Sequence, residues 1–137
     1  MLQGTLKMNT HKKVSVHWLS EPEKHDYLAA RSYMSLMVSE RIAKTLVKNL
    51  KHAAISQFKA KDVFRASDLS LLGVSNSHVE KDRQKILSRR KLSPILLVRN
   101  EKLARVTIAD GYHRLCAIYS FDEDAVIPCK IVGLDGE

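Results

Sequence analysis

The most constraining feature of the sequence is the order of short apolar segments in its last third. The segment PILLVR begins at Pro94 and is typical of a buried strand, because proline is tolerated at a strand start and the apolar run is unbroken. A hairpin-like connection leads to a second strand, ARVTIAD, and VIPCKIV is a third. A helix is expected between the last two strands, at residues 112–121 after Gly111. This order predicts an α+β fold with a small mixed sheet.

Helices are expected in the first half of the chain. Ser20 precedes the sequence Glu-Pro-Glu, which offers a capping hydroxyl, a first-turn proline and acids at the positive end of a helix dipole. Ser39 is expected to open a second helix, whose apolar residues recur on one face. The stretch 58–78 is irregular and is expected to hold a short helix at about 62–67. Ser77 is expected to cap the helix that follows.

The length of the chain, 137 residues, suits one domain with a modest core. We expect residues 1–13 to form a flexible tail and residues 14–137 to form a single domain. Within that domain, a helical front at 14–76 is expected to pack on a core at 77–137. No apolar run is long enough to span a membrane, and the N-terminus lacks the apolar segment of a secretory signal.

The two cysteines, Cys116 and Cys129, lie in apolar segments and lack the spacing of a metal or redox motif. We expect them to be reduced core thiols in a cytoplasmic protein. The six histidines show no metal-ligand spacing either. A structural metal site is therefore not expected.

The chain is basic, with 23 Lys and Arg against 15 Asp and Glu and a net charge of +8. This balance favours an anionic partner, such as a nucleic acid, a nucleotide or a phosphorylated metabolite. The cations crowd into one stretch, at Lys81, Arg83, Lys85, Arg89, Arg90 and Lys91. The run 89–91 has two open interpretations: a contact to nucleic-acid phosphates, or a solvated helix end where cations are favoured.

The junction TIADGYHRLCAIYSF, residues 107–121, places basic side chains at the start of the expected helix. The first backbone N–H groups of a helix have no intrahelical partner and lie at its positive end, so they bind anions. Gly111 allows close approach to the backbone and a positive φ. Arg114 could clamp phosphate oxygens, and His113 could donate a ring N–H. Gly111, Tyr112, His113 and Arg114 are therefore the candidate site.

Electrostatics favours this interpretation over a plain turn. A cation at a helix N-terminus is unfavourable by roughly 0.3–1 kcal/mol, and a bound anion would reverse that sign. Asp110, just before the turn, has two open roles: it holds Mg²⁺ near a phosphate, or it caps the turn. The aromatic residues Tyr112, Tyr119 and Phe121 are either a base-stacking surface or, as their helical spacing favours, core packing.

The segment 78–132 resembles the core of the ParB/sulfiredoxin superfamily. The resemblance rests on the apolar strand after Pro94, the Gly-Tyr-His-Arg turn, the small residues Cys116 and Ala117, and the closing strand with Ile127-Pro128. More loosely, the chain from about residue 27 resembles short, stand-alone ParB-like proteins of bacteria.

The resemblance implies a bound nucleotide, and a basic helix that supplies residues to it. Lys81 and Lys85 are four residues apart and share one helix face. Sulfiredoxin chemistry is not expected, because Tyr112 stands where that reaction needs a cysteine. A complete partition protein is not expected either, because the chain ends at Glu137, soon after the core. The superfamily includes kinases of small hydroxyl compounds.

These observations leave three functional hypotheses. The first is a nucleotide- or phosphate-binding domain, with ATP, ADP or CTP and an accompanying Mg²⁺ as candidate ligands; it extends to a phosphotransferase or nucleotide hydrolase. The second is a DNA-binding or nuclease-like accessory protein that uses the stretch 81–91. The third is a protein-interaction domain that kept the fold. No catalytic residue is identified.

Overall fold

The computed structural model describes residues 14–135 and has the expected α+β architecture. The flexible tail predicted for residues 1–13 lies outside the described residues. The helices are α2 (Lys24–Met34), α3 (Glu40–His52), α4 (Ala60–Ser67), α5 (Ser77–Leu87) and α6 (Tyr112–Phe121). The strands are β1 (His17–Trp18), β2 (Ser56–Lys59), β3 (Lys91–Leu92), β4 (Ile95–Asn100), β5 (Arg105–Asp110) and β6 (Val126–Gly133).

The main sheet is mixed, as the sequence predicted, and its strand order is β2-β6-β4-β5. Strand β4 pairs antiparallel with β5 and parallel with β6, while β2 pairs antiparallel with β6. Strands β1 and β3 form a separate two-stranded parallel pair.

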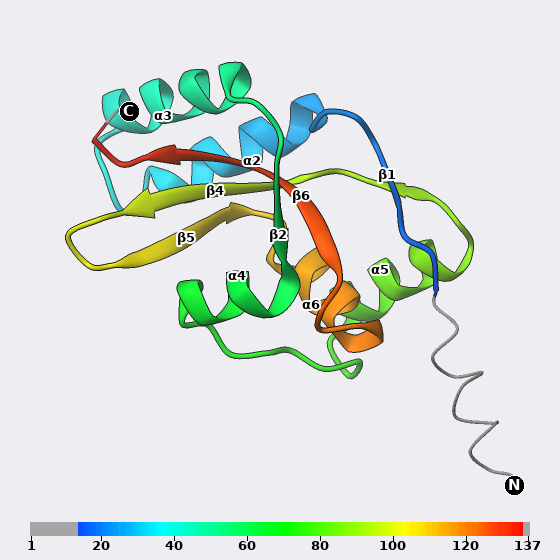
Figure 1. Cartoon of the computed structure of the whole chain (residues 1–137). Coiled ribbons are helices and arrows are strands. Elements are labelled where there is room, and N and C mark those ends of the chain that lie inside the picture. The colour runs from blue at the N-terminus through cyan, green and yellow to red at the C-terminus, as the bar shows by residue number, and fades with distance from the viewer. Residues whose placement is uncertain (1–13, 136–137) are drawn as a thin grey trace, which may run out of the picture.

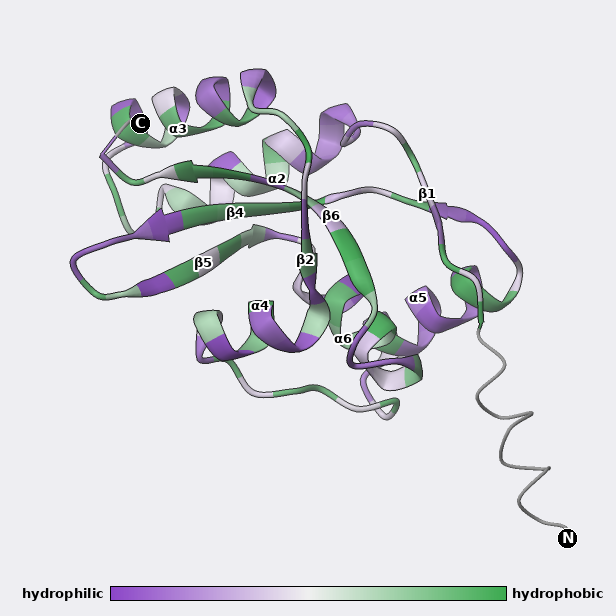
Figure 2. Cartoon of the chain, in the orientation of Figure 1, coloured by the Kyte–Doolittle hydropathy of each residue, from purple (hydrophilic) through white to green (hydrophobic). Residues whose placement is uncertain are grey.

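Helices cover both faces of the main sheet (Figure 1). Ile95 and Leu97 point into a core formed with α4, α5 and α6. Leu96 and Val98 point into a second core formed with α2 and α3. This alternation explains why β4 is an unbroken apolar run, because a strand covered on both faces needs apolar residues at every position. Figure 2 shows hydrophobic colour along much of the central strands β4 and β6, while helices such as α3 alternate hydrophilic and hydrophobic residues.

Two local predictions about helix starts were wrong. Helix α2 does not begin after Ser20; it begins at Lys24, where the Asp26 carboxylate accepts a hydrogen bond of 2.7 Å from the Glu23 N–H. Helix α5 is capped by Asn76, whose side-chain oxygen accepts from two backbone N–H groups, and Ser77 is the first helical residue. The front of the domain also contributes a strand, β2, to the sheet.

Other expectations are confirmed. The Ser39 hydroxyl caps α3, and α6 has the predicted bounds. Cys116 and Cys129 are both buried and free. Tyr119 and Phe121 pack against the core, as their spacing favoured. Among the described residues no helix has the length and apolar character needed to cross a membrane.

Candidate functional site

The junction between β5 and α6 is a sharp turn that only glycine fits well. Gly111 has a φ of 113°, in the region that side chains disfavour. A Cβ at this position would lie 2.5 Å from Cδ1 of Ile95, a residue with no exposed surface. The turn lets the strand end at Asp110 and the helix begin at Tyr112 without a break in packing.

The N-terminus of α6 has no side-chain cap and no acid in its first turn. The first backbone N–H that bonds within the helix is that of Leu115, which donates to the Gly111 carbonyl at 2.9 Å. The N–H groups of the three residues between them lie at the positive end of the helix dipole. This end of α6 is therefore suited to an anion.

A polar cleft of about 200 Å³ opens at this helix end. It is lined by His78, Lys81, Asp82, Lys85, Asp110, Gly111, Tyr112, His113 and Arg114. The structure thus brings together all six residues that the sequence singled out for phosphate binding, together with Asp110. Helix α5 supplies one wall of the cleft and the β5–α6 junction supplies the other.

Sequence reasoning missed two cleft residues, His78 and Asp82. Both lie on the same face of α5 as Lys81 and Lys85, so the helical spacing 78, 81, 82, 85 was a usable signal. The Asp82 carboxylate lies 3.8 Å from the Lys85 ammonium. The rings of His78 and His113 lie next to each other, with centroids 4.9 Å apart and planes tilted by 42°.

His113 is half-buried, and burial lowers its pKa below the ordinary value of 6.5. The neighbouring His78 lowers it further, and Asp82 partly offsets the change. Burial likewise raises the pKa of Tyr112, whose hydroxyl donates a hydrogen bond to the Ser70 carbonyl.

Arg114 lies at the back of the cleft and has protein partners for most of its donors. Its Nε donates to the Ser93 carbonyl at 3.0 Å, and one terminal nitrogen donates to the Pro94 carbonyl at 3.2 Å and to Asp110 at 3.1 Å. The other terminal nitrogen lies 3.8 Å from the Asp26 carboxylate. The side chain is 16% exposed, so Arg114 joins the segment before β4, the end of β5 and α2 to α6 more than it extends into the cleft.

Two carboxyl groups therefore share one guanidinium. Asp26 is 2% exposed and Asp110 is 17% exposed. Burial raises the pKa of Asp110 to about 6; Arg114 offsets part of the rise, and Asp26 adds to it. Asp110 does not cap the turn through the backbone; its carboxylate accepts from Arg114 instead.

One group of three potential metal ligands is present in the described part of the chain, at Glu23, His25 and Asp26. Asp110 is not a member of that group. The Asp26 carboxylate already accepts a backbone hydrogen bond and faces Arg114, so this group is explained by the start of α2. The Mg²⁺ role of Asp110 stays a prediction.

The raised pKa of Asp110 predicts a pH-dependent stability. The folded state holds the proton more tightly than the unfolded chain, so its contribution to the free energy of unfolding falls as pH rises from about 4 to about 6. Asp110→Asn removes this titration. The free energy of unfolding of the variant minus that of the wild type is therefore expected to rise by about 2–3 kcal/mol from pH 4 to pH 7. Urea unfolding of both proteins at each pH measures this difference.

A second aspartate provides a control of opposite sign. Lys61, 2.8 Å from Asp124, lowers the pKa of that exposed carboxyl. Asp124→Asn is therefore expected to lose stability relative to the wild type as pH rises. A difference between wild type and Asp110→Asn that does not change with pH would contradict the assignment of a buried, proton-holding Asp110.

Comparisons of the chain with protein-family models, with curated proteins and with solved structures gave no match. The resemblance to the ParB/sulfiredoxin superfamily therefore stays a prediction.

Proposed function

We propose that the protein binds a phosphate group in the cleft at the start of α6, either as inorganic phosphate or as the phosphate of a nucleotide such as ATP, ADP or CTP. One observation carries the proposal: an uncapped helix N-terminus and four nitrogen-bearing side chains, of His78, Lys81, Lys85 and His113, line the same cleft. Phosphate is the common biological anion that accepts hydrogen bonds from all of these groups at once.

The acidic residues of the cleft do not oppose this function. Asp82 lies near the Lys85 ammonium, and Asp110 is bound to Arg114. A pKa of about 6 for Asp110 also means that a nearby anion can favour its neutral form near neutral pH. Because Arg114 is held by the protein, we assign the direct phosphate contacts to the α6 backbone, His113, Lys81 and Lys85.

Calorimetric titration tests the proposal, with inorganic phosphate, ATP, ADP and CTP added separately, each with and without Mg²⁺. Each charge-assisted hydrogen bond contributes roughly 1.5–3 kcal/mol, so Lys81→Gln/Lys85→Gln is expected to weaken binding at least about tenfold. Lys24→Gln/Lys102→Gln removes the same charge from exposed lysines elsewhere and is expected to bind as the wild type does. Equal affinities for both double variants, or no binding of any ligand, would overturn the proposal.

Phosphoryl transfer or nucleotide hydrolysis would use the same cleft. Mg²⁺ would then arrive with the phosphates, and Asp110, one of whose carboxylate oxygens accepts from Arg114, stays the candidate ligand for it. Incubation with ATP and Mg²⁺ tests hydrolysis, in which water is the acceptor. Release of phosphate that is lost in Lys81→Gln/Lys85→Gln would indicate a nucleotide hydrolase, whereas unchanged ATP would exclude hydrolysis; a test of phosphoryl transfer needs an added hydroxyl compound as acceptor.

Anion binding is expected to depend on pH. A bound anion stabilises the protonated imidazolium of His113, so binding takes up a proton where the free histidine is neutral. Affinity should therefore rise as pH falls from about 8 to about 5.5. Sulfate is the suitable probe because it stays a dianion over this range.

A variant separates His113 from the other ionisable groups of the cleft. His113→Gln keeps a side-chain donor but cannot become charged, so its sulfate affinity should depend less steeply on pH. The remaining dependence is expected from Asp110, whose protonation also favours an anion. If the sulfate affinity of His113→Gln depends on pH as that of the wild type does, His113 does not contribute to the pH effect.

A further inference from the structure

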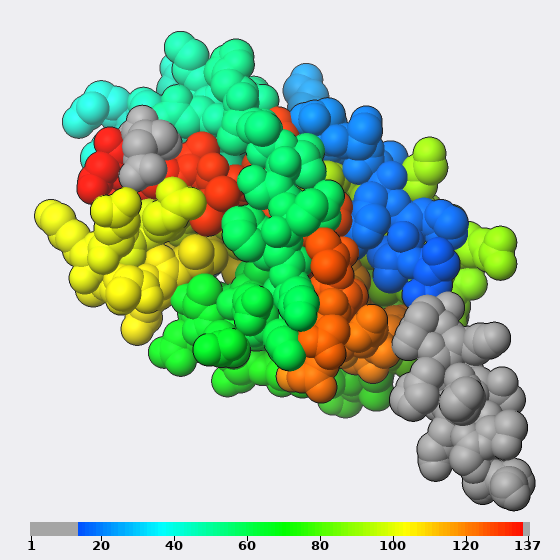
Figure 3. Space-filling view, in the orientation of Figure 1, coloured from blue at the N-terminus to red at the C-terminus, as the bar shows by residue number. Residues whose placement is uncertain are grey.

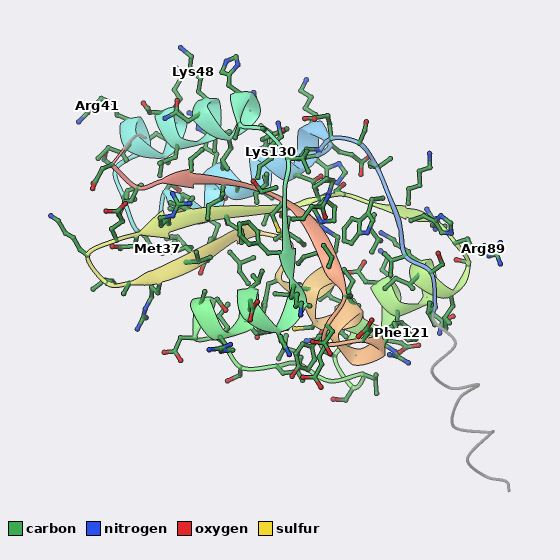
Figure 4. The ribbon with its side chains drawn as sticks, viewed as in Figure 1. Met37, Arg41, Lys48, Arg89, Phe121 and Lys130 are labelled. Carbon is green, nitrogen blue, oxygen red and sulfur yellow. The ribbon has the colours of Figure 1, made fainter. Side chains whose placement is uncertain are left out.

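The exposed face of α3 carries a line of cations, Arg41, Lys44, Lys48 and Lys51, which we call the α3 basic stripe. Spacings of three and four residues place the four side chains on one side of the helix. At a rise of about 1.5 Å per residue the stripe is about 15 Å long. Arg41 and Lys48 point away from the sheet (Figure 4), and α3 forms an outer edge of the molecule (Figure 3).

The charge of this stripe is not compensated by acids. Glu40 is the one acidic residue of α3, and the Arg31 guanidinium already binds it at 2.5 Å. The next acidic residue in the sequence is Asp62. Within residues 14–135, Arg41, Lys44 and Lys48 make no ion pair.

Helix α5 differs in this respect, although the sequence marked it as the basic segment. Its Arg83 pairs with Glu80, and its Lys85 lies near Asp82. The guanidinium of Arg83 also lies over the Phe121 ring, 4.1 Å from its centroid, and donates to the Ser120 hydroxyl. Part of the charge of α5 is thus used inside the fold. In α3 the Lys51 ammonium lies over the Tyr27 ring, 5.7 Å from its centroid, whereas Arg41, Lys44 and Lys48 are exposed.

Arg41, Lys44 and Lys48 are not needed to hold α3 in place, whereas Lys51 lies in the last turn, where the helix dipole favours a cation. The helix is held by its opposite face, where Ala43, Leu46, Val47 and Leu50 are buried. Like charges three or four residues apart on a helix are destabilising by roughly 0.2–0.5 kcal/mol per pair. A polyanion along the helix would reverse the sign of this contribution.

We propose that the α3 basic stripe binds the sugar–phosphate backbone of a nucleic acid, independently of base sequence. The backbone is a continuous array of negative charges, which suits cations that recur along the whole helix. A membrane surface fits less well, because α3 exposes no large apolar side chain and its apolar face lies in the core. The stripe lies on the sheet face opposite α6, so this site is separate from the phosphate cleft.

Fluorescence anisotropy with a short labelled duplex DNA and with the corresponding single strand, over a series of salt concentrations, tests the proposal. The test variant is Arg41→Gln/Lys44→Gln/Lys48→Gln. Glutamine has nearly the helix propensity of arginine and lysine, so α3 is expected to keep its structure, which circular dichroism checks. Lys51 is left intact because its ammonium lies over the Tyr27 ring, 5.7 Å from the centroid, so its replacement would also remove a contact within the fold.

The matched control, Arg89→Gln/Arg90→Gln/Lys91→Gln, removes the same charge from exposed residues after α5. We expect the α3 variant to bind duplex DNA roughly tenfold more weakly at low salt, with a slope of log affinity against log salt reduced by about 2–3. The control should keep the slope of the wild type. Equal losses in both variants would reduce the effect to net charge and overturn the proposal. Absence of DNA binding by the wild type, including the case in which it binds anionic lipid vesicles instead, would also overturn it.

Discussion

Replacement of Gly111 by alanine is expected to lower the free energy of unfolding by about 2–5 kcal/mol. Two effects add to this loss. A φ of 113° costs an L-residue about 1–3 kcal/mol, and the new Cβ would lie 2.5 Å from Cδ1 and 3.2 Å from Cγ2 of Ile95. Ile95 has no exposed surface, so its side chain can move only by repacking the core.

Gly73 is the matched control for this substitution. A Cβ on Gly73 meets no atom within 4 Å, and its φ lies outside the range that strains a side chain. Gly73→Ala should therefore change stability by no more than about 0.5 kcal/mol. Urea unfolding of both variants measures the difference. Equal, small effects at the two glycines would contradict the tight turn between β5 and α6.

Replacement of Arg114 by methionine is expected to cost about 3–5 kcal/mol, because it leaves two buried carboxyl groups without their shared guanidinium. The Asp26 and Asp110 carboxylates would face each other uncompensated. The carbonyls of Ser93 and Pro94 would each lose a donor as well. The loss should be smaller at acid pH, where the carboxyl groups take up protons.

A double-mutant cycle distinguishes this electrostatic cause from lost packing. Asp110→Asn/Arg114→Met removes one of the two charges and is expected to recover part of the stability lost in Arg114→Met. Arg65→Met breaks an exposed ion pair with Asp62 and should change stability by less than about 1 kcal/mol. If the double variant loses as much as the sum of the single ones, the carboxyl pair is not the cause.

The structural role of Arg114 affects the choice of variants for testing phosphate binding. The sequence marked Arg114 as a phosphate clamp, but the structure gives most of its donors to the protein. Weaker binding in Arg114→Ala would therefore not separate a lost contact from a disturbed cleft. Lys81 lies at the surface and Lys85 is half-buried, and both line the cleft, so they provide the cleaner substitution sites.

The elements predicted correctly are those whose own residues decide their structure. Helix α6 follows a glycine at a strand end, and β4 is an apolar run after a proline. Strand β2 was not predicted, because its sequence, SQFK, has one large apolar residue and is mostly exposed. It becomes a strand through pairing with β6, an interaction between distant segments that local sequence does not show.

The residues of the candidate site likewise fall into those that local sequence could place and those that it could not. The spacing of Lys81 and Lys85 placed them on one helix face, and the dipeptide Asp110-Gly111 indicated the turn. Asp26 could not be placed, because it reaches Arg114 and Asp110 from a helix near the other end of the chain. Packing of α2 on β5 creates that contact, which adds to the rise in the pKa of Asp110 that burial causes.

The most direct test of the phosphate cleft is a titration of the nitrogen-15-labelled protein with inorganic phosphate, followed by two-dimensional proton–nitrogen NMR. If phosphate binds at the start of α6, the largest shifts will occur in the backbone amides of Tyr112, His113 and Arg114, and in Lys81→Gln/Lys85→Gln the same shifts will need at least about tenfold more phosphate. Largest shifts in α3, or a spectrum that phosphate does not change, would contradict the account.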